Sequence, residues 1–187
     1  MFKPPSHINK ALNEQYDVID KANTKVAELW KDEIIFSFGW WGATMLVIVP
    51  WIVWIFYRKK DSTHRLLLGG IWAMFIATWL DYIGVAMGLW RYNVKTMPVI
   101  PDFIAWDFSL MPVTIMFFIQ VKPTIKPVYK AIFFSLLTSF GAEPFFKWLG
   151  FFDYPSWHYI ASFPFYIAIY MVASKLVNGS KFNSLHS

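Results

Sequence analysis

Residues 66–90 read LLLGGIWAMFIATWLDYIGVAMGLW, and Asp81 is the one charged side chain among them. An α-helix needs roughly 20 apolar residues to cross the ~30 Å hydrocarbon core of a bilayer, and this stretch is long enough. Backbone N–H and C=O groups in lipid have to pair within their own segment, so we expect helix throughout. The stretch therefore predicts a membrane-spanning helix with a carboxyl group inside it.

Four more stretches on either side have a similar composition: residues 34–57, 103–121, 128–149 and 157–177. Together they predict an all-α fold, a bundle of about five transmembrane helices. Pro112 and Pro144 fall inside two of the stretches, and because proline lacks a backbone donor we expect both helices to bend. The predicted organisation is an N-terminal segment over residues 1–33, a transmembrane domain over 34–177 and a short cytoplasmic tail over 178–187.

The composition supports this interpretation. Hydrophobic residues make up 57% of the chain and charged residues 16%, against about 25% charged in soluble domains. Many of the 11 Trp and 19 Phe lie at the ends of the apolar stretches, as in the aromatic belts at membrane surfaces. The absence of Cys excludes disulfides and thiolate metal sites. The net charge of +5 follows the loops, so it predicts no nucleic-acid partner.

Lys and Arg collect in alternate loops. One side holds Arg91, Lys95 and Lys147, and the other holds Arg58, Lys59, Lys60, Arg65, Lys122, Lys126, Lys130, Lys175 and Lys181. The positive-inside rule puts the second set in the cytoplasm. We therefore predict a multi-pass protein with its N-terminus outside and its C-terminus in the cytoplasm.

Residues 8–30 carry apolar side chains at helical spacing on one stripe: Leu12, Tyr16, Ile19, Val26 and Trp30. Charges of both signs lie between them, which predicts an amphipathic, extracytoplasmic helix. It could lie along the membrane surface or cover the bundle as a lid. Alternatively it could pair with a copy of itself, although Asn23 on the stripe would weaken that seam.

Asp81, Asp107 and Glu143 come out at a similar depth near the outer face, within a turn or two at about 1.5 Å of rise per residue. A carboxylate in a membrane helix costs about 2.5–3.5 kcal/mol on insertion scales. It therefore has to face the bundle interior, pair, or stay protonated. The three acids are the candidate catalytic residues, able in principle to transfer a proton, hold a cation or stabilise positive charge on an apolar substrate.

Separate structural roles are an equal alternative for two of the acids. Glu143 could form an ion pair with Lys147 at i, i+4, and Asp107 could cap the outer end of its helix. Asp81 has no such local partner. The predicted ligand-binding set combines the acids with their neighbours: Asp81, Trp90, Tyr92, Trp106, Asp107, Glu143, Lys147 and His158. His158 fits an interfacial residue better than a ligand.

The sequence leaves the cofactor unknown. A transition-metal site is disfavoured because the chain has no Cys and a single His near the acids, whereas a hard cation on carboxylates stays open. Gly84 and Gly88 form a small-xxx-small pattern that predicts close helix packing. A homo-oligomer could form through this face or through the N-terminal helix.

Several short strings occur in a fixed order: DYIG at 81–84, GLWRY at 88–92, WD at 106–107, PV at 112–113, EP at 143–144 and SFP at 162–164. As a set they resemble an uncharacterised family of small, roughly five-span membrane proteins of Bacillus- and Clostridium-type bacteria. The resemblance covers about residues 40–177. It implies a place in the bacterial cell (cytoplasmic) membrane and brings no established activity.

The GLWRY string between two acid-bearing helices is also similar to a turn in the membrane lycopene cyclase domains of carotenoid synthesis. That resemblance implies acid–base chemistry on an isoprenoid. The chain departs from those cyclases, since their paired Glu residues after a Pro are not present. Here Trp106 and Asp107 stand at that place, and Pro112 comes after the acid.

Three functions are therefore compatible with the sequence. The first is binding of a lipid or apolar small molecule in an outer-leaflet pocket lined by carboxylates and aromatic residues, with membrane lipids as partners. The second is a membrane-embedded cyclase- or isomerase-like enzyme acting on an isoprenoid or lipid. The third is a small ion- or proton-conducting oligomer, which is disfavoured because the acids gather at one level.

Overall fold

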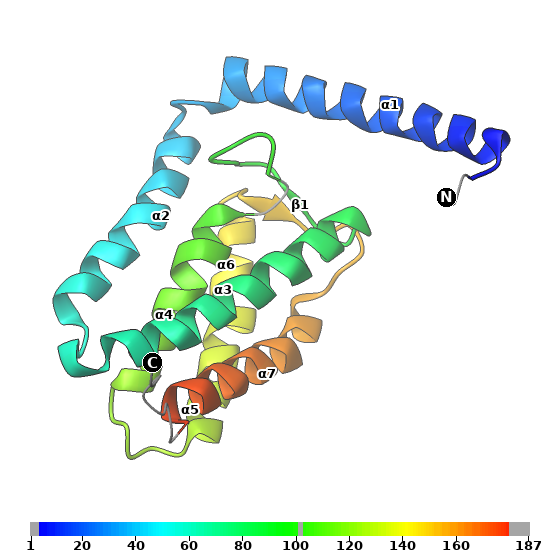
Figure 1. The fold of residues 1–187 in the computed structure, drawn as a ribbon. Helices are drawn as coiled ribbons and strands as arrows, with labels where there is room; N and C mark the ends of the chain where they lie inside the picture. Colours follow the sequence, from blue (N-terminus) through cyan, green and yellow to red (C-terminus); the bar gives the residue numbers. More distant parts are fainter. Residues whose placement is uncertain (1–3, 101–102, 180–187) are drawn as a thin grey trace, which may run out of the picture.

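The computed structural model describes residues 4–100 and 103–179, most of them helical. Along the chain the elements are α1 (Ser6–Leu29), η1 (Trp30–Ile34), α2 (Phe38–Tyr57), η2 (Lys60–Ser62), α3 (Thr63–Ala86), β1 (Arg91–Tyr92), η3 (Trp106–Leu110), α4 (Met111–Gln120), α5 (Pro127–Leu136), η4 (Leu137–Ala142), α6 (Glu143–Trp148), β2 (Phe152–Asp153) and α7 (Tyr159–Asn178) (Figure 1). The all-α class is confirmed. Lys181 and the predicted tail beyond residue 179 lie outside the described residues.

Within the described residues, three helical segments are long and apolar enough to cross a membrane: Phe38–Tyr57, Lys60–Ala86 and Tyr159–Asn178. The predicted third span is a shorter apolar helix, Trp106–Gln120. The predicted fourth span is the helical run from α5 through η4 to α6. Three segments are therefore candidate membrane spans by length and composition, and a total of five crossings stays a prediction.

π-Helical turns precede the two prolines that were expected to disturb their helices. η3 ends at Leu110, just before Pro112, and η4 ends at Ala142, just before Pro144. A proline cannot donate to the carbonyl four residues earlier. For Pro112 that carbonyl belongs to Phe108, and the Nε1–H of Trp51 in α2 donates to it over 2.8 Å. A neighbouring helix thus satisfies the backbone group that the proline leaves free.

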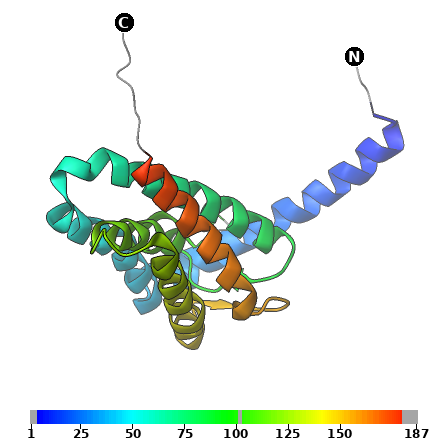
Figure 2. The same ribbon diagram turned by 90° about the horizontal axis from the view of Figure 1, so that it is seen from below.

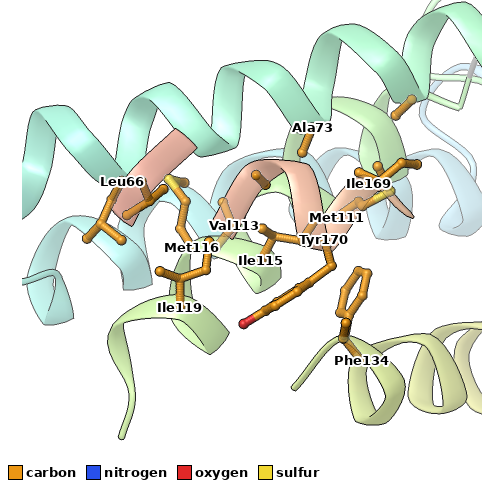
Figure 3. Packing of buried hydrophobic residues seen from close by; sticks show 14 of the residues in the cluster. Leu66, Ala73, Met111, Val113, Ile115, Met116, Ile119, Phe134, Ile169 and Tyr170 are labelled. Atoms are coloured by element: carbon orange, nitrogen blue, oxygen red, sulfur yellow. The ribbon is translucent and has the colours of Figure 1, made fainter. Parts of the chain in front are cut away.

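Small residues on α3 let it pack closely between α4 and α7. Gly69 lies against Ala173 and Val177 of α7, and Gly70 lies against Met116 of α4. Met116 belongs to a buried apolar core that also contains Tyr170, beside which the ring of Phe134 lies (Figure 3). This tight packing is at Gly69 and Gly70, which the sequence pattern did not single out.

Two predicted helix ends are placed differently by the structure. α2 begins at Phe38 and not at 34, because Phe36 has a positive φ of 61° and the Ser37 side chain caps the new helix. α3 ends at Ala86, and Gly88 follows with a φ of 71°. Trp90 therefore lies in a loop and not at the end of a helix.

α1 lies outside the bundle and projects away from it (Figure 2). None of its residues is buried, and its apolar stripe is exposed. At its base the Nε1–H of Trp30 donates to the Lys95 carbonyl over 2.8 Å, and that of Trp40 donates to the Thr96 carbonyl over 3.1 Å. The corner between α1 and α2 thus rests on the loop after β1. Membrane-surface binding and self-pairing of α1 both stay predictions.

Candidate functional site

Two loops that pair through β1 and β2 close one end of the bundle, and we call residues 88–94 and 150–157 the cap. β1 and β2 are antiparallel, with Arg91 opposite Asp153 and Tyr92 opposite Phe152. Each loop begins at a glycine of positive φ, Gly88 at 71° and Gly150 at 77°. Glycine adopts this left-handed conformation without strain, and it commonly ends helices. The cap brings aromatic side chains from both loops over the ends of α3 and α6.

A cavity of about 250 Å³ lies beneath the cap, walled by α3, η3, α6, α7 and the cap itself. Asp81, Asp107 and Glu143 all line it. The rest of its wall is mainly apolar or aromatic, and it includes three more predicted ligand-binding residues, Trp90, Tyr92 and Trp106. The structure therefore brings six of the eight predicted site residues to one cavity.

Asp81 is buried and accepts hydrogen bonds from three donors. The Nε1–H of Trp90 and the hydroxyl of Tyr92 both donate to its Oδ1 over 2.5 Å, and the backbone N–H of Phe103 donates to its Oδ2 over 3.1 Å. A Cβ added at Gly84 would overlap the Trp90 ring. Gly84 therefore makes room for the indole that bonds Asp81. The acid without a local partner in sequence obtains its partners from the cap and from Phe103, just before the next helix.

Asp107 is also buried, and its carboxyl group shares a hydrogen bond with that of Asp81. Ionised carboxylates only accept hydrogen bonds, so this contact requires a proton on one of the two acids. Asp81 also accepts from three other donors, so the pair combines the acceptor side of one acid with a proton held between the two. Asp107 thus lines the cavity beside Asp81, and it also lies in the first turn of η3, near the start of its helix.

Glu143 is the third buried acid, and three hydroxyl groups donate to it. Those of Tyr154 and Ser162 donate to its Oε2, the latter over 3.2 Å, and that of Tyr166 donates to its Oε1 over 2.8 Å. The Nε1–H of Trp157 donates to the Ser162 oxygen over 2.9 Å, which orients this hydroxyl. Cap and α7 side chains together satisfy Glu143.

The remaining two predicted ligand-binding residues, Lys147 and His158, are not among the residues that line the cavity. The Nζ of Lys147 lies 5.5 Å from the centroid of the Tyr154 ring. Hydroxyl groups donate to the Glu143 carboxyl group, for which an ion pair with Lys147 was one of the alternatives. His158 is the N-cap of α7, where its Nδ1 accepts from the Ile160 N–H over 3.3 Å. Both residues therefore lie near the site without lining the cavity.

Residues outside the predicted site supply all three donors to Glu143. Ser162 and Tyr166 are spaced i, i+4, so they share one face of α7, and that spacing was a usable signal. Tyr154 and Phe103 lie outside any helix, and no local pattern indicates that they reach an acid.

The cavity is electronegative. Among its described lining residues are three acids and no Lys, Arg or His. Burial raises the pKa of the Tyr92 hydroxyl well above its usual range, and the nearby Asp81 and Asp107 carboxyl groups raise it further. Burial and the Glu143 carboxylate likewise raise the pKa of Tyr154. Both phenols therefore stay protonated and act as hydrogen-bond donors to the acids.

No family model, curated protein or solved structure matches this chain.

Proposed function

We propose that this chain is an integral membrane protein that binds a lipid or an apolar small molecule in the cavity beneath the cap. The observation that carries the proposal is the shared cavity of about 250 Å³, in which three acids face a mainly aromatic and apolar wall. Ligand sites are typically concave and apolar, with a few convergent polar groups.

The size of the cavity limits the ligand. A dry apolar cavity of about 150 Å³ holds benzene, and pockets for drug-sized ligands run from about 300 Å³ upward. The cavity lies between these values at about 250 Å³. It suits a small molecule, or one end of a longer lipid whose remainder stays in the bilayer.

The flank of the cavity supports entry from the membrane. Ile83 of α3 and Phe165 of α7 both line it, yet each is 46% exposed. Both residues belong to helical segments that are apolar enough to cross a bilayer. An apolar ligand would pass between them directly from lipid, without crossing water.

The proposal includes the predicted topology of five crossings in the bacterial cytoplasmic membrane, with the N-terminus outside. The cap end carries Arg91 and Lys95, and the opposite end carries the larger basic set that includes Lys59, Lys60 and Lys122. The positive-inside rule then places the cap outside and the cavity in the outer leaflet. Membership of the five-span bacterial family belongs to the same proposal.

A second candidate function is enzymatic, and the contact between Asp81 and Asp107 favours it. A protonated carboxyl group at a largely apolar cavity is placed to act as a general acid on an isoprenoid or lipid. The carboxylate of Asp81 would then accept the proton back. Catalytic roles for Asp81, Asp107 and Glu143 belong to this second candidate function.

Mass spectrometry of copurifying molecules tests the binding function. Wild type and Asp81→Asn, purified in parallel, should differ in one or more bound lipids or small molecules, which the variant loses. Asp61→Asn is the matched control, since Asp61 is an exposed acid in η2 and does not line the cavity, whose residues on α3 begin only at Ala77. Identical bound molecules in wild type and Asp81→Asn would contradict the proposal.

A further inference from the structure

The donors that satisfy the two outer acids point to the charge of the ligand. Asp81 accepts from an indole N–H, a phenol and a backbone N–H, and Glu143 accepts from three hydroxyls. A carboxyl group that accepts on both oxygens has the pattern of an ionised carboxylate. Every one of these donors is neutral, so the hydrogen-bond partners bring no positive charge to either acid.

The cavity wall supplies no compensation either. The described lining residues include no Lys, Arg or His. Lys147 is not in the lining, and its Nζ lies over the Tyr154 ring, 5.5 Å from the centroid. Burying a charge without an opposite charge nearby is costly in free energy. In a buried ion pair, removing one partner is strongly destabilising because the other charge is left uncompensated. A positively charged ligand would supply the charge that balances the two acids.

Aromatic side chains form much of the cavity wall beside the acids. Trp90, Trp106, Trp157 and Tyr166 all line the cavity. Trp90 and Trp157 meet edge to face, with centroids 5.3 Å apart at 72°, and their Nε1–H groups are held by Asp81 and Ser162. Rings fixed in this way attract cations, and aromatic cages around a carboxylate recognise ammonium groups.

We propose, resting on the proposed binding function, that the ligand is an organic cation, an ammonium group attached to an apolar body. The ammonium lies among Asp81, Glu143 and the tryptophans, and the apolar body points toward Ile83 and Phe165. A bare metal ion fits less well, because hard cations take six or more oxygen ligands and the oxygens of Asp81 and Glu143 already accept from protein donors.

Two probes of equal shape test the charge. Phenyltrimethylammonium and tert-butylbenzene differ in having N⁺ or C at the branch point, so they separate charge from size. Each is titrated into the full chain in detergent, and the dissociation constant is measured by calorimetry with an empty-micelle blank. We expect wild type to bind the ammonium at least tenfold more tightly than the hydrocarbon.

Variants connect the preference to the acids. Asp81→Asn and Glu143→Gln are measured separately, so that one variant still tests the inference if the other does not fold. In each, the preference for the ammonium probe over the hydrocarbon should fall at least fivefold. Asp61→Asn should keep it. Equal or tighter binding of tert-butylbenzene to wild type overturns the charge inference and leaves the binding function standing. Binding of neither probe, together with no copurifying molecule, overturns both.

Discussion

The Nε1–H of Trp90 donates to Oδ1 of Asp81 over 2.5 Å, and this contact joins the cap to α3 across nine positions of sequence. The indole reaches the acid because Gly84 leaves the space that its ring fills. The cap, Gly84 and the Asp81 carboxyl group therefore pack against one another. A substitution at any one of them should perturb the position of the other two.

Gly84→Ala should destabilise the protein by about 1–3 kcal/mol, because the added methyl overlaps the Trp90 ring and forces it away from Asp81. Thermal unfolding in detergent measures the loss. Gly42→Ala is the control, since a Cβ there would meet only Phe151, at an ordinary 3.7 Å. That helical substitution should be neutral or stabilise by up to about 1 kcal/mol. Equal effects of the two variants would contradict the role given to Gly84.

Tyr166→Phe should cost about 1.5–3 kcal/mol, because a hydrogen bond to a charged group is lost from buried Glu143. Tyr170→Phe, one turn along the same helix, is the matched control. The Tyr170 hydroxyl is buried without a hydrogen-bond partner, so its removal should cost little or stabilise. Denaturation midpoints of both variants measure the two losses of stability. A larger loss in Tyr170→Phe than in Tyr166→Phe would contradict the prediction.

Asp81 and Asp107 should be energetically coupled, because they share a hydrogen bond and one proton. In a double-mutant cycle of unfolding free energies, Asp81→Asn and Asp107→Asn should interact by about 0.5–3 kcal/mol. The pair Asp81→Asn and Asp61→Asn serves as the reference and should be additive, since Asp61 lies outside the cavity lining. Simple additivity of the first pair would argue against a shared proton.

Ile83→Trp should weaken binding of any cavity ligand at least tenfold, because a larger side chain narrows the flank between α3 and α7. Ile71→Trp makes the same exchange at another exposed site of α3, where Ile71 is 58% exposed and does not line the cavity. Both probes named above report the change by calorimetry. Unchanged affinity in Ile83→Trp would place the entrance elsewhere, for example through the cap.

The predicted topology can be checked by labelling, since the chain has no native cysteine. Asp61→Cys and Asp153→Cys introduce exposed thiols at the two ends of the bundle. A membrane-impermeant maleimide applied to intact cells should label position 153 and spare position 61. Labelling of both or neither from outside would overturn the topology, and labelling of position 61 alone would invert it.

The sequence by itself determined the helices and the acids within them. Apolar runs and helical spacing are local properties, which is why the all-α class, the exposed amphipathic α1 and the placement of Asp81, Asp107 and Glu143 could be predicted. A disturbance of the helices at Pro112 and Pro144 was expected for the same reason, since a missing backbone donor acts on the carbonyl four residues away. The sequence predicted a bend there, and the π-helical turns that precede both prolines were not predicted.

Only the tertiary structure decided which groups satisfy the acids. Glu143 turns to Tyr154, Ser162 and Tyr166 and not to the nearby Lys147, and Asp81 turns to Trp90, Tyr92 and Phe103. These partners lie from 9 to 23 positions away, so their contacts depend on how the cap folds and how α7 packs. A buried acid accepts hydrogen bonds from the donors that tertiary packing places beside it, and local spacing in the sequence does not predict which donors these are.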